Sequence, residues 1–419
     1  MVTVTKERLH LLYPAFAEQK DFYLGRITAV EKGFWAQFGQ KPVRLFSAPG
    51  RTEIGGNHTD HQQGCVLAAS VDLDVLAAAA PNGTTVVRVL SEGYPLSEVD
   101  LSDLSVRKEE ENTSEALVRG MAKAMEERGK HIQGFDLYAT SNVLKGSGLS
   151  SSAAYEVLLG TVMNGLFCDG VFTDVEIAQM GQFAENVYFG KPSGLMDQMA
   201  SSVGNIVAID FADKKNPQVR RVDFDFEQTG HCLCIVDSGA DHADLTDAYS
   251  AIPKEMKDVA GFFGKEVLRE VDEEAFFAAL PQVRQATGDR AVLRAIHFFA
   301  DSRRAQQEAE ALEQGDFDQF LQLVCQSGQS SFQYLQNISV EGAVAHQEVA
   351  VALAVCEKAL GDKGAFRVHG GGFAGTIMAF VPQTDVEGFQ KTMEERLAPG
   401  CCHVLHIRAV GGVEIWMGE

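Results

Sequence analysis

Residues 145–156 read Lys145-Gly146-Ser147-Gly148-Leu149-Ser150-Ser151-Ser152-Ala153-Ala154-Tyr155-Glu156. An alternating apolar and polar run over 135–139 precedes them and predicts a strand, and apolar periodicity over 150–167 predicts a helix. Gly146 and Gly148 permit a tight turn that brings successive backbone N–H groups close to a ligand. The start of the helix adds unpaired N–H groups and the positive end of the helix dipole.

Serine hydroxyls strengthen the same interpretation. A helix needs only one serine as a cap, whereas three stand in a row at 150–152. Because no Gly-Lys-Ser/Thr run follows the glycines, the turn is not a Walker A loop. We therefore predict a phosphate-binding turn of another kind, made of Gly146, Ser147, Gly148, Leu149, Ser150, Ser151 and Ser152.

The composition makes local groups necessary for holding phosphate. Among 419 residues, 36 Lys and Arg stand against 58 Asp and Glu, which gives a formal net charge of −22. Such a surface repels nucleic-acid backbones and anionic lipid, so neither a nucleic-acid nor a membrane partner is predicted. A phosphorylated small molecule must then be bound by devices such as the glycine–serine turn.

The first residues and the cysteines indicate a cytoplasmic protein. Residues 1–7 carry no apolar h-region, and no long uncharged run predicts a membrane span. The eight cysteines form no CxxC pair, so no structural zinc site is predicted. We expect reduced thiols in the core.

Length and periodicity predict an α+β chain with two lobes. The first forty residues are expected to be largely helical. Alternating runs at 71–75 and 86–90, separated by Pro81-Asn82-Gly83, predict a β-hairpin. The apolar run over 231–237 predicts a strand that opens the second lobe, and most of 260–360 is expected to be helical. The two lobes are placed at 1–226 and 227–419.

A second polar cluster lies within residues 48–61. Asn57, His58 and Asp60 offer donors and acceptors that suit the hydroxyls of a sugar, and Arg51 suits an anion. Two other interpretations stay open from the residues alone. His58, Asp60 and His61 are possible metal ligands, and the cluster is also compatible with an ordinary solvated loop.

A third cluster, His369-Gly370-Gly371-Gly372-Phe373-Ala374-Gly375, satisfies the spacing G-x-G-x-x-G. A dinucleotide-binding turn requires a helix directly after these glycines. Here the apolar run over 376–382 predicts a strand instead. A Rossmann site is therefore excluded, and a glycine-rich strand–turn–strand is predicted.

Taken in order, these clusters resemble the motifs of the GHMP small-molecule kinases, and among them those of the galactokinase family. The matching segments are 50–60 for the galactokinase signature, 148–153 for the phosphate loop, 194–198 for the catalytic segment and 370–375 for the third motif. The resemblance implies the two-lobed GHMP kinase fold. In that fold the N-terminal lobe is like domain 2 of ribosomal protein S5, the C-terminal lobe is ferredoxin-like, and the active site lies in the cleft between them.

The activity implied by the resemblance is ATP-dependent phosphorylation of the C1 hydroxyl of galactose. Asp197 corresponds to the catalytic base, and Arg51 to the neighbour that lowers its pKa and stabilises the phosphoryl group. Ser152 and Glu185 correspond to the magnesium ligands, so Mg²⁺ is the implied cofactor. Ser91 corresponds to a further nucleotide contact.

The resemblance also implies the sugar contacts and the partners. ATP and a monosaccharide are the implied partners, and no obligate protein partner is expected. The implied sugar-binding residues are Asn57, His58, Thr59, Asp60, Gly194 and Tyr249.

Two positions depart from the family pattern. Galactokinases usually carry Glu where this chain has Asn57, and Tyr where it has His61. The usual Glu is expected to accept a hydrogen bond from the C6 hydroxyl of galactose. Asn57 suits that hydroxyl and also tolerates a C6 carboxylate, which a Glu would repel.

These departures leave two alternatives to a galactokinase. The run Asp60-His61-Gln62 resembles that of plant-type galacturonokinases, so galacturonate is the alternative substrate. A sugar-sensing relative without catalysis is the second alternative. The intact phosphate loop and the presence of Arg51, Glu185 and Asp197 favour an enzyme.

Overall fold

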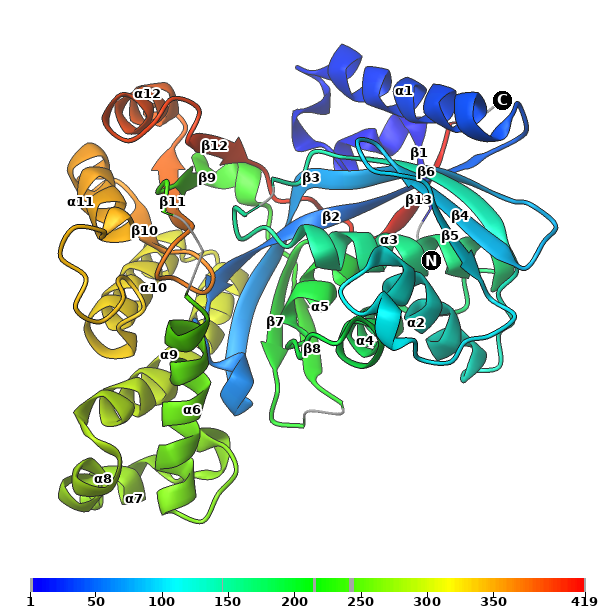
Figure 1. Cartoon of the computed structure of the whole chain (residues 1–419). Coiled ribbons are helices and arrows are strands. Elements are labelled where there is room, and N and C mark those ends of the chain that lie inside the picture. Colours follow the sequence, from blue (N-terminus) through cyan, green and yellow to red (C-terminus); the bar gives the residue numbers. More distant parts are fainter. Residues whose placement is uncertain (1–2, 145, 214–215, 241–244, 418–419) are drawn as a thin grey trace.

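Two separate β-sheets organise the chain in the computed structural model, which describes residues 3–144, 146–213, 216–240 and 245–417 (Figure 1). Lys145, at the start of the glycine–serine turn, lies outside the described residues. Among those described, no helix combines the length and apolar character needed to cross a membrane. All eight cysteines are free thiols.

The larger sheet contains the N-terminal strands and also the last strand of the chain. β13 pairs antiparallel with β2 and parallel with β1, so residues 413–416 belong to this sheet although they lie in the predicted 227–419 lobe. The division at residue 226 stays a prediction for the rest of the chain. The strand order is β1 (Thr3–Thr5), β13 (Val413–Trp416), β2 (Arg44–Gly55), β3 (Cys65–Pro81), β6 (Phe135–Ser141), β4 (Val86–Ser91) and β5 (Ser97–Asp100), with β7 (Ile206–Asp210) and β8 (Gln218–Val222) extending from β3.

The predicted hairpin of 71–75 with 86–90 is wrong. β6 lies between β3 and β4, antiparallel to the first and parallel to the second. The Pro81-Asn82-Gly83 turn does connect the end of β3 to the segment before β4. A local turn signal cannot reveal that a strand some fifty residues later takes the place between them.

Side-chain alternation along β3 assigns the two faces of the larger sheet. Leu76, Ala78 and Ala80 pack with the buried face of α1 (Lys20–Phe38), which confirms a helix within the first forty residues. Ala77 and Ala79 belong to the core on the opposite face, and Figure 1 shows the other helices of this lobe on that side. These helices are α2 (Ser114–Glu126), α3 (Ser151–Phe167), α4 (Asp174–Phe183) and α5 (Met196–Val203).

The smaller sheet is antiparallel, in the order β10 (Ala365–Val368), β11 (Thr376–Pro382), β9 (His231–Asp237) and β12 (Cys402–Leu405). On β9, Cys234 and Val236 pack in the core under α11 (Glu348–Leu360) and α12 (Val386–Arg396). Leu233 and Ile235 point to the core that continues into the first lobe through α10 (Phe317–Ser330). The remaining helices are α6 (Thr246–Phe262), α7 (Glu273–Ala278), α8 (Leu280–Thr287) and α9 (Asp289–Glu313).

This architecture brings the sequence clusters together. The glycine–serine turn connects β6 to α3, the second cluster covers the last part of β2 and the turn after it, and residues 194–198 enter α5. The third cluster forms the turn between β10 and β11, and a strand follows its glycines as predicted. Ends of elements from both lobes therefore meet at one place.

Candidate active site

The glycine–serine turn leaves the start of α3 without a side-chain cap. Gly146 and Gly148 have φ of +74° and +73°, a region in which glycine avoids the clash of a Cβ. Ser150 is the N-cap residue with φ +52°, yet its side chain caps no N–H group of the helix. The simple interpretation of a serine-capped helix is therefore wrong. The first N–H groups of α3 stay available to an anion.

The Ser150 hydroxyl instead donates to Oδ2 of Asp197, at 2.7 Å. Arg51 binds the same carboxylate in a bidentate manner, with Nε to Oδ1 at 2.7 Å and Nη2 to Oδ2 at 2.6 Å. Its Nη1 donates to the carbonyl of Gly148, and the N–H of Arg51 donates to the carbonyl of Leu149 at 3.0 Å. Arg51 thus ties the catalytic segment to the phosphate loop.

Charge and exposure suit Asp197 to a reacting hydroxyl. Burial alone would raise the pKa of this carboxyl, but the charge and hydrogen bonds of Arg51, with the Ser150 hydroxyl, outweigh burial and lower it. The side chain of Asp197 is 32% exposed, whereas that of Arg51 is 9% exposed. The anion is therefore held by buried groups on one side and reachable by a ligand on the other. The structure thus brings the two residues together, and their catalytic roles stay a prediction.

His369, in the third cluster, and Thr376, directly after it, hold the phosphate loop through hydrogen bonds. The Thr376 hydroxyl donates to the carbonyl of Ser147 at 2.9 Å, and Nδ1 of His369 lies 2.9 Å from that hydroxyl. Nδ1 must then carry the proton, and Nε2 accepts from the Thr52 hydroxyl at 3.0 Å. Burial, with the charges of Arg51 and other cations, lowers the pKa of His369 to about 3. The imidazole is therefore neutral.

A cavity of about 580 Å³ opens beside the phosphate loop. Ser91, the predicted nucleotide contact, and Ser151 of the loop both line it, together with Tyr94 and Tyr155. Its wall is formed by β4, the end of β6 and the starts of α2 and α3. The structure thus brings Ser91 and the loop to one cavity, of a size that suits a nucleoside.

Four of the predicted sugar-binding residues contact either one another or the glycine turn at 370–372. An added Cβ at Gly194 would lie 2.5 Å from Oδ2 of Asp60, so the catalytic segment touches the second cluster. Nε2 of His58 lies 2.9 Å from the carbonyl of Gly371. The Tyr249 hydroxyl donates to the carbonyl of Gly372 at 2.8 Å. The glycine turn of the third cluster therefore connects the sugar-binding candidates.

Asn57 and Thr59 are enclosed by protein groups in this structure, and their contacts with a sugar stay a prediction. Both are fully buried. The Thr59 hydroxyl makes hydrogen bonds to the carbonyls of Gly56 and Cys65, within its own turn. The Asn57 amide donates twice and accepts twice within the protein. A contact of Asn57 with the C6 group of a sugar is therefore not supported.

The second cluster also lacks the alternative metal site. Among the described residues, no group of three or more His, Cys, Asp or Glu is arranged to hold a metal ion. His58 and His61 lie side by side with ring centroids 5.9 Å apart. Burial and the neighbouring His61 lower the pKa of His58 to about 4. The solvated-loop alternative fails as well, because most of 48–60 is buried.

The two residues assigned to magnesium lie on connected elements. Ser152 and Glu156 share a face of α3, being four residues apart. Nε2 of Gln198 donates both to Glu156, at 2.9 Å, and to Glu185, at 2.8 Å. Glu185 is buried and also binds Lys191 at 3.0 Å. One hydroxyl and one carboxylate fit Mg²⁺, which keeps waters and binds phosphate oxygens of a substrate.

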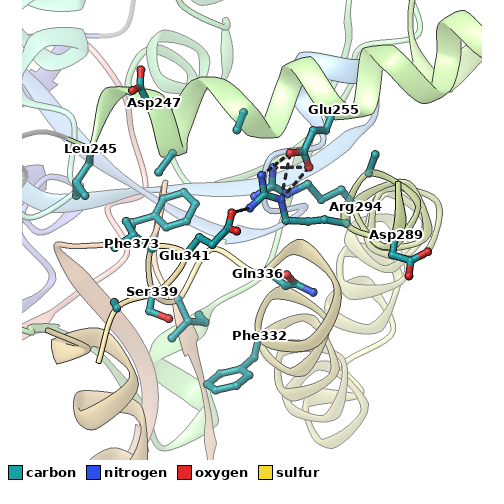
Figure 2. Close-up of a pocket in the computed structure, with 18 of the residues that line it drawn as sticks. Leu245, Asp247, Glu255, Asp289, Arg294, Phe332, Gln336, Ser339, Glu341 and Phe373 are labelled. Carbon is teal, nitrogen blue, oxygen red and sulfur yellow. Dashed lines mark hydrogen bonds and ion pairs between the residues drawn. The ribbon is translucent and has the colours of Figure 1, made fainter. Parts of the chain in front are cut away.

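A cavity of about 1170 Å³ lies apart from the residues predicted for the site. None of the residues predicted for the site is among those that line it. Figure 2 shows Arg294 joined to Glu255, and the two groups are 2.8 Å apart. Arg290 also pairs with Glu255 and with Glu341. Because both arginines are paired, and carboxylates outnumber them in the lining, this cavity does not suit a polyphosphate.

Some residues of the site were not predicted from the sequence. From the sequence, His369 is only the residue before three glycines, and no local pattern indicates a role for Thr376, Gln198 or Lys191. Their contacts depend on the folded chain; Thr376, for example, donates to the carbonyl of Ser147, which is distant in sequence. Glu156 is the last residue of the segment 145–156 that contains the glycine–serine turn. Burial and the charge of Glu185 raise its pKa well above the usual value.

Two family models match segments of this chain, and solved kinase structures share its fold. Residues 116–205 match the GHMP kinases N terminal domain, and residues 32–81 match the galactokinase galactose-binding signature. The structure of Lactococcus lactis galactokinase complexed with galactose superposes with a TM-score of 0.77 at 25% identity, over 92% of this chain and 99% of that one. Mevalonate kinase from Methanococcus jannaschii gives a TM-score of 0.62 at 13% identity, over 88% and 99%.

The comparisons confirm the predicted fold class, because the mixed α/β architecture matches both galactokinase and mevalonate kinase. The identity to mevalonate kinase shows the fold alone. The two matched segments contain the second cluster, the phosphate loop and Asp197. The chain therefore carries a GHMP kinase N-terminal domain and a galactokinase galactose-binding signature on the fold of the GHMP kinases.

Proposed function

We propose that this chain is an ATP-dependent sugar kinase that phosphorylates the anomeric C1 hydroxyl of galactose and releases galactose 1-phosphate. One observation carries the proposal. The Asp197 carboxylate is held by Arg51 and Ser150 at the uncapped start of α3, and the next residue, Ser151, lines the cavity that also contains Ser91. The galactose-binding signature over residues 32–81 supports the choice of sugar.

Asp197 orients the attacking hydroxyl and accepts its proton. Because its pKa is lowered, the carboxylate is ionised at neutral pH and is a weak base. It therefore accepts a hydrogen bond in the ground state and takes the proton late, as bonding to phosphorus develops. Arg51 stabilises the negative charge of the transferring group without reorganising, since its guanidinium is already fixed by the carboxylate.

The polyphosphate is bound by fixed dipoles. The backbone N–H groups of residues 146–151 and of the first turn of α3 face the phosphates, and the nucleoside occupies the cavity lined by Ser91 and Ser151. Ser152 and Glu185 would hold Mg²⁺, which would supply charge neutralisation for the phosphates. This arrangement needs no positive surface, which agrees with a net charge of −22.

The sugar is recognised between the two lobes. Asp60, beside Gly194, accepts from hydroxyls, and neutral His58, whose Nε2–H donates to the carbonyl of Gly371, offers Nδ1 as an acceptor. Tyr249 packs its ring against Phe373, with centroids 5.4 Å apart, and gives the site an apolar wall. These residues suit a neutral polyol more than an anion.

An ATP-consumption screen tests the proposal. Galactose, galacturonate, arabinose and N-acetylgalactosamine are compared, and the product is identified by NMR as the 1-phosphate. We expect galactose to be the best substrate and Asp197→Asn to lose at least about a thousandfold in kcat while still binding ATP. Turnover of galacturonate alone would assign the uronic acid instead. Binding of ATP and sugar by the wild type without turnover would support a sensor and exclude the kinase.

A further inference from the structure

Two buried side chains on the second cluster form a carboxylate–amide pair. Nδ2 of Asn57 donates to Oε1 of Glu53 at 2.8 Å. Glu53 is 5% exposed and Asn57 is not exposed at all. Glu53 belongs to β2, and Asn57 begins the turn that carries the sugar-binding candidates.

Both members of this pair are anchored in the second lobe. Oε1 of Glu53 accepts from Nη2 of Arg367 on β10 at 2.8 Å. Nδ2 of Asn57 donates to the carbonyl of Gly370 at 2.7 Å, and its Oδ1 accepts from Asn337 at 2.8 Å and from Ser331 at 3.2 Å. Every hydrogen-bonding position of the Asn57 amide is therefore used.

The same contacts set the shape of the sugar region. Gly371 is the next residue after Gly370, and its carbonyl oxygen lies 2.9 Å from Nε2 of His58. His58 has a φ of +59°, so its direction depends on how its neighbours hold the backbone. The N–H of Asn57 donates to Asp301 at 2.9 Å, which fixes the backbone just before His58.

We propose that Glu53 and Asn57 act as one positioning unit, which locks the turn of His58 against the glycine turn at 370–372, and that Asn57 does not touch the sugar. This inference rests on the proposed sugar-kinase function. It also explains the missing family Glu. With Glu53 in place, an acidic residue at position 57 would face another carboxylate and the carbonyl of Gly370, with no proton to donate to either.

Isosteric exchange tests the unit. Asn57→Asp should place two carboxylates together and raise the sugar KM by about tenfold or more, while the ATP KM stays within about twofold. Adding Glu53→Gln restores a single carboxylate, because the amide introduced at position 53 can donate to the carboxylate at position 57 and still accept from Arg367. The double variant should therefore return the sugar KM to within about threefold of Glu53→Gln alone.

Substrate preference separates this unit from a direct contact. If Asn57 lies away from the sugar, Asn57→Asp should change kcat/KM for galactose and galacturonate by the same factor, within about threefold. A loss for galacturonate more than about tenfold larger would show that residue 57 meets the C6 group, and would overturn the proposal. A fall in kcat with both KM values unchanged would show a loss of folded enzyme only, and would overturn it as well.

Thermal unfolding of the same four proteins needs no turnover. Glu53→Gln should raise the Tm of the Asn57→Asp variant while lowering or leaving that of the wild type. Independent effects on Tm would refute the unit. If the wild type phosphorylates no sugar, the proposed function fails, but the unfolding result still decides whether the two side chains are coupled.

Discussion

The hydroxyl of Ser150 lies 2.7 Å from Oδ2 of Asp197, although Ser150 occupies the N-cap position of α3. A serine at this position usually accepts a hydrogen bond from an N–H group of the helix. Here it donates to the catalytic segment instead. The phosphate-binding end of the helix and the candidate base are thus held in one arrangement, and the helix N–H groups are left for a ligand.

Ser150→Ala should move the acid limb of the pH–rate profile to higher pH. The hydroxyl stabilises the ionised form of Asp197, and its loss raises the pKa of that carboxyl. The rate should fall by about tenfold, the equivalent of one hydrogen bond to a charged group. The profile of kcat/KM measures both, provided that it extends below pH 3.8, the ordinary pKa of an Asp, from which that of Asp197 is lowered. Ser147→Ala, whose hydroxyl donates to Leu144, should leave the acid limb in place; an equal shift in both variants contradicts the assignment.

Gly148→Ala should weaken ATP binding more than backbone strain alone explains. Gly148 has φ +73°, and an added Cβ would lie 3.0 Å from Nδ1 of His369. We expect a rise of about tenfold in the ATP KM, together with a strain of about 1–2 kcal/mol in the stability. Gly83→Ala is the matched control, because Gly83 has φ +72° with nothing within 4 Å. The control should lower Tm without changing the ATP KM.

Glu185→Gln should increase the requirement for Mg²⁺. The substitution removes the carboxylate that, with Ser152, is proposed to bind the ion. The Mg²⁺ concentration for half-maximal activity should rise about tenfold, and the maximal rate should be largely recovered at high Mg²⁺. Titration of activity against free Mg²⁺ at fixed ATP measures this. Glu109→Gln, at an exposed carboxylate, serves as the control, and identical titrations for both variants would exclude Glu185 as a ligand.

His369→Gln should flatten the dependence of stability on pH in weakly acidic solution. The pKa of His369 is lowered from 6.5 to about 3 in the folded protein. The unfolded chain therefore binds a proton that the folded chain does not, and stability is lost as pH falls below 6.5. The slope from this residue is at most about 1.4 kcal/mol per pH unit. Chemical unfolding at pH 6.5, 5.5 and 4.5 compares the slopes; equal slopes in the two proteins would show that folding does not lower the pKa of His369.

The order of motifs made much of the site predictable. The phosphate turn and the excluded Rossmann helix follow from residue types and spacing over short segments, whereas the roles of Arg51 and Asp197 follow from the resemblance to the GHMP kinases. A glycine pair before an apolar helix, or a strand after three glycines, leaves few alternatives for the local backbone. These inferences needed no knowledge of which segments become neighbours.

The strand pairing of β3 and β4 and the surroundings of Asn57 depend on segments that are distant in sequence. β6 enters between β3 and β4 because its alternating faces fit both partners, and the turn at Pro81-Asn82-Gly83 contains no sign of it. Asn57 has the right chemistry for a sugar hydroxyl, but Asn337, 280 residues later, uses its acceptor. Polarity alone cannot tell whether a side chain faces a ligand or is satisfied within the protein.

By itself, then, the sequence predicted a phosphate-binding glycine–serine turn and determined that the net charge of the chain is −22. Tertiary structure alone decided that Ser150 turns to Asp197, that His369 supports the turn, and that Asn57 is enclosed. The physical reason is the range of the interactions. Backbone conformation and periodicity are set by near neighbours, whereas burial, hydrogen-bond satisfaction and pKa are set by groups that only the folded chain brings within reach.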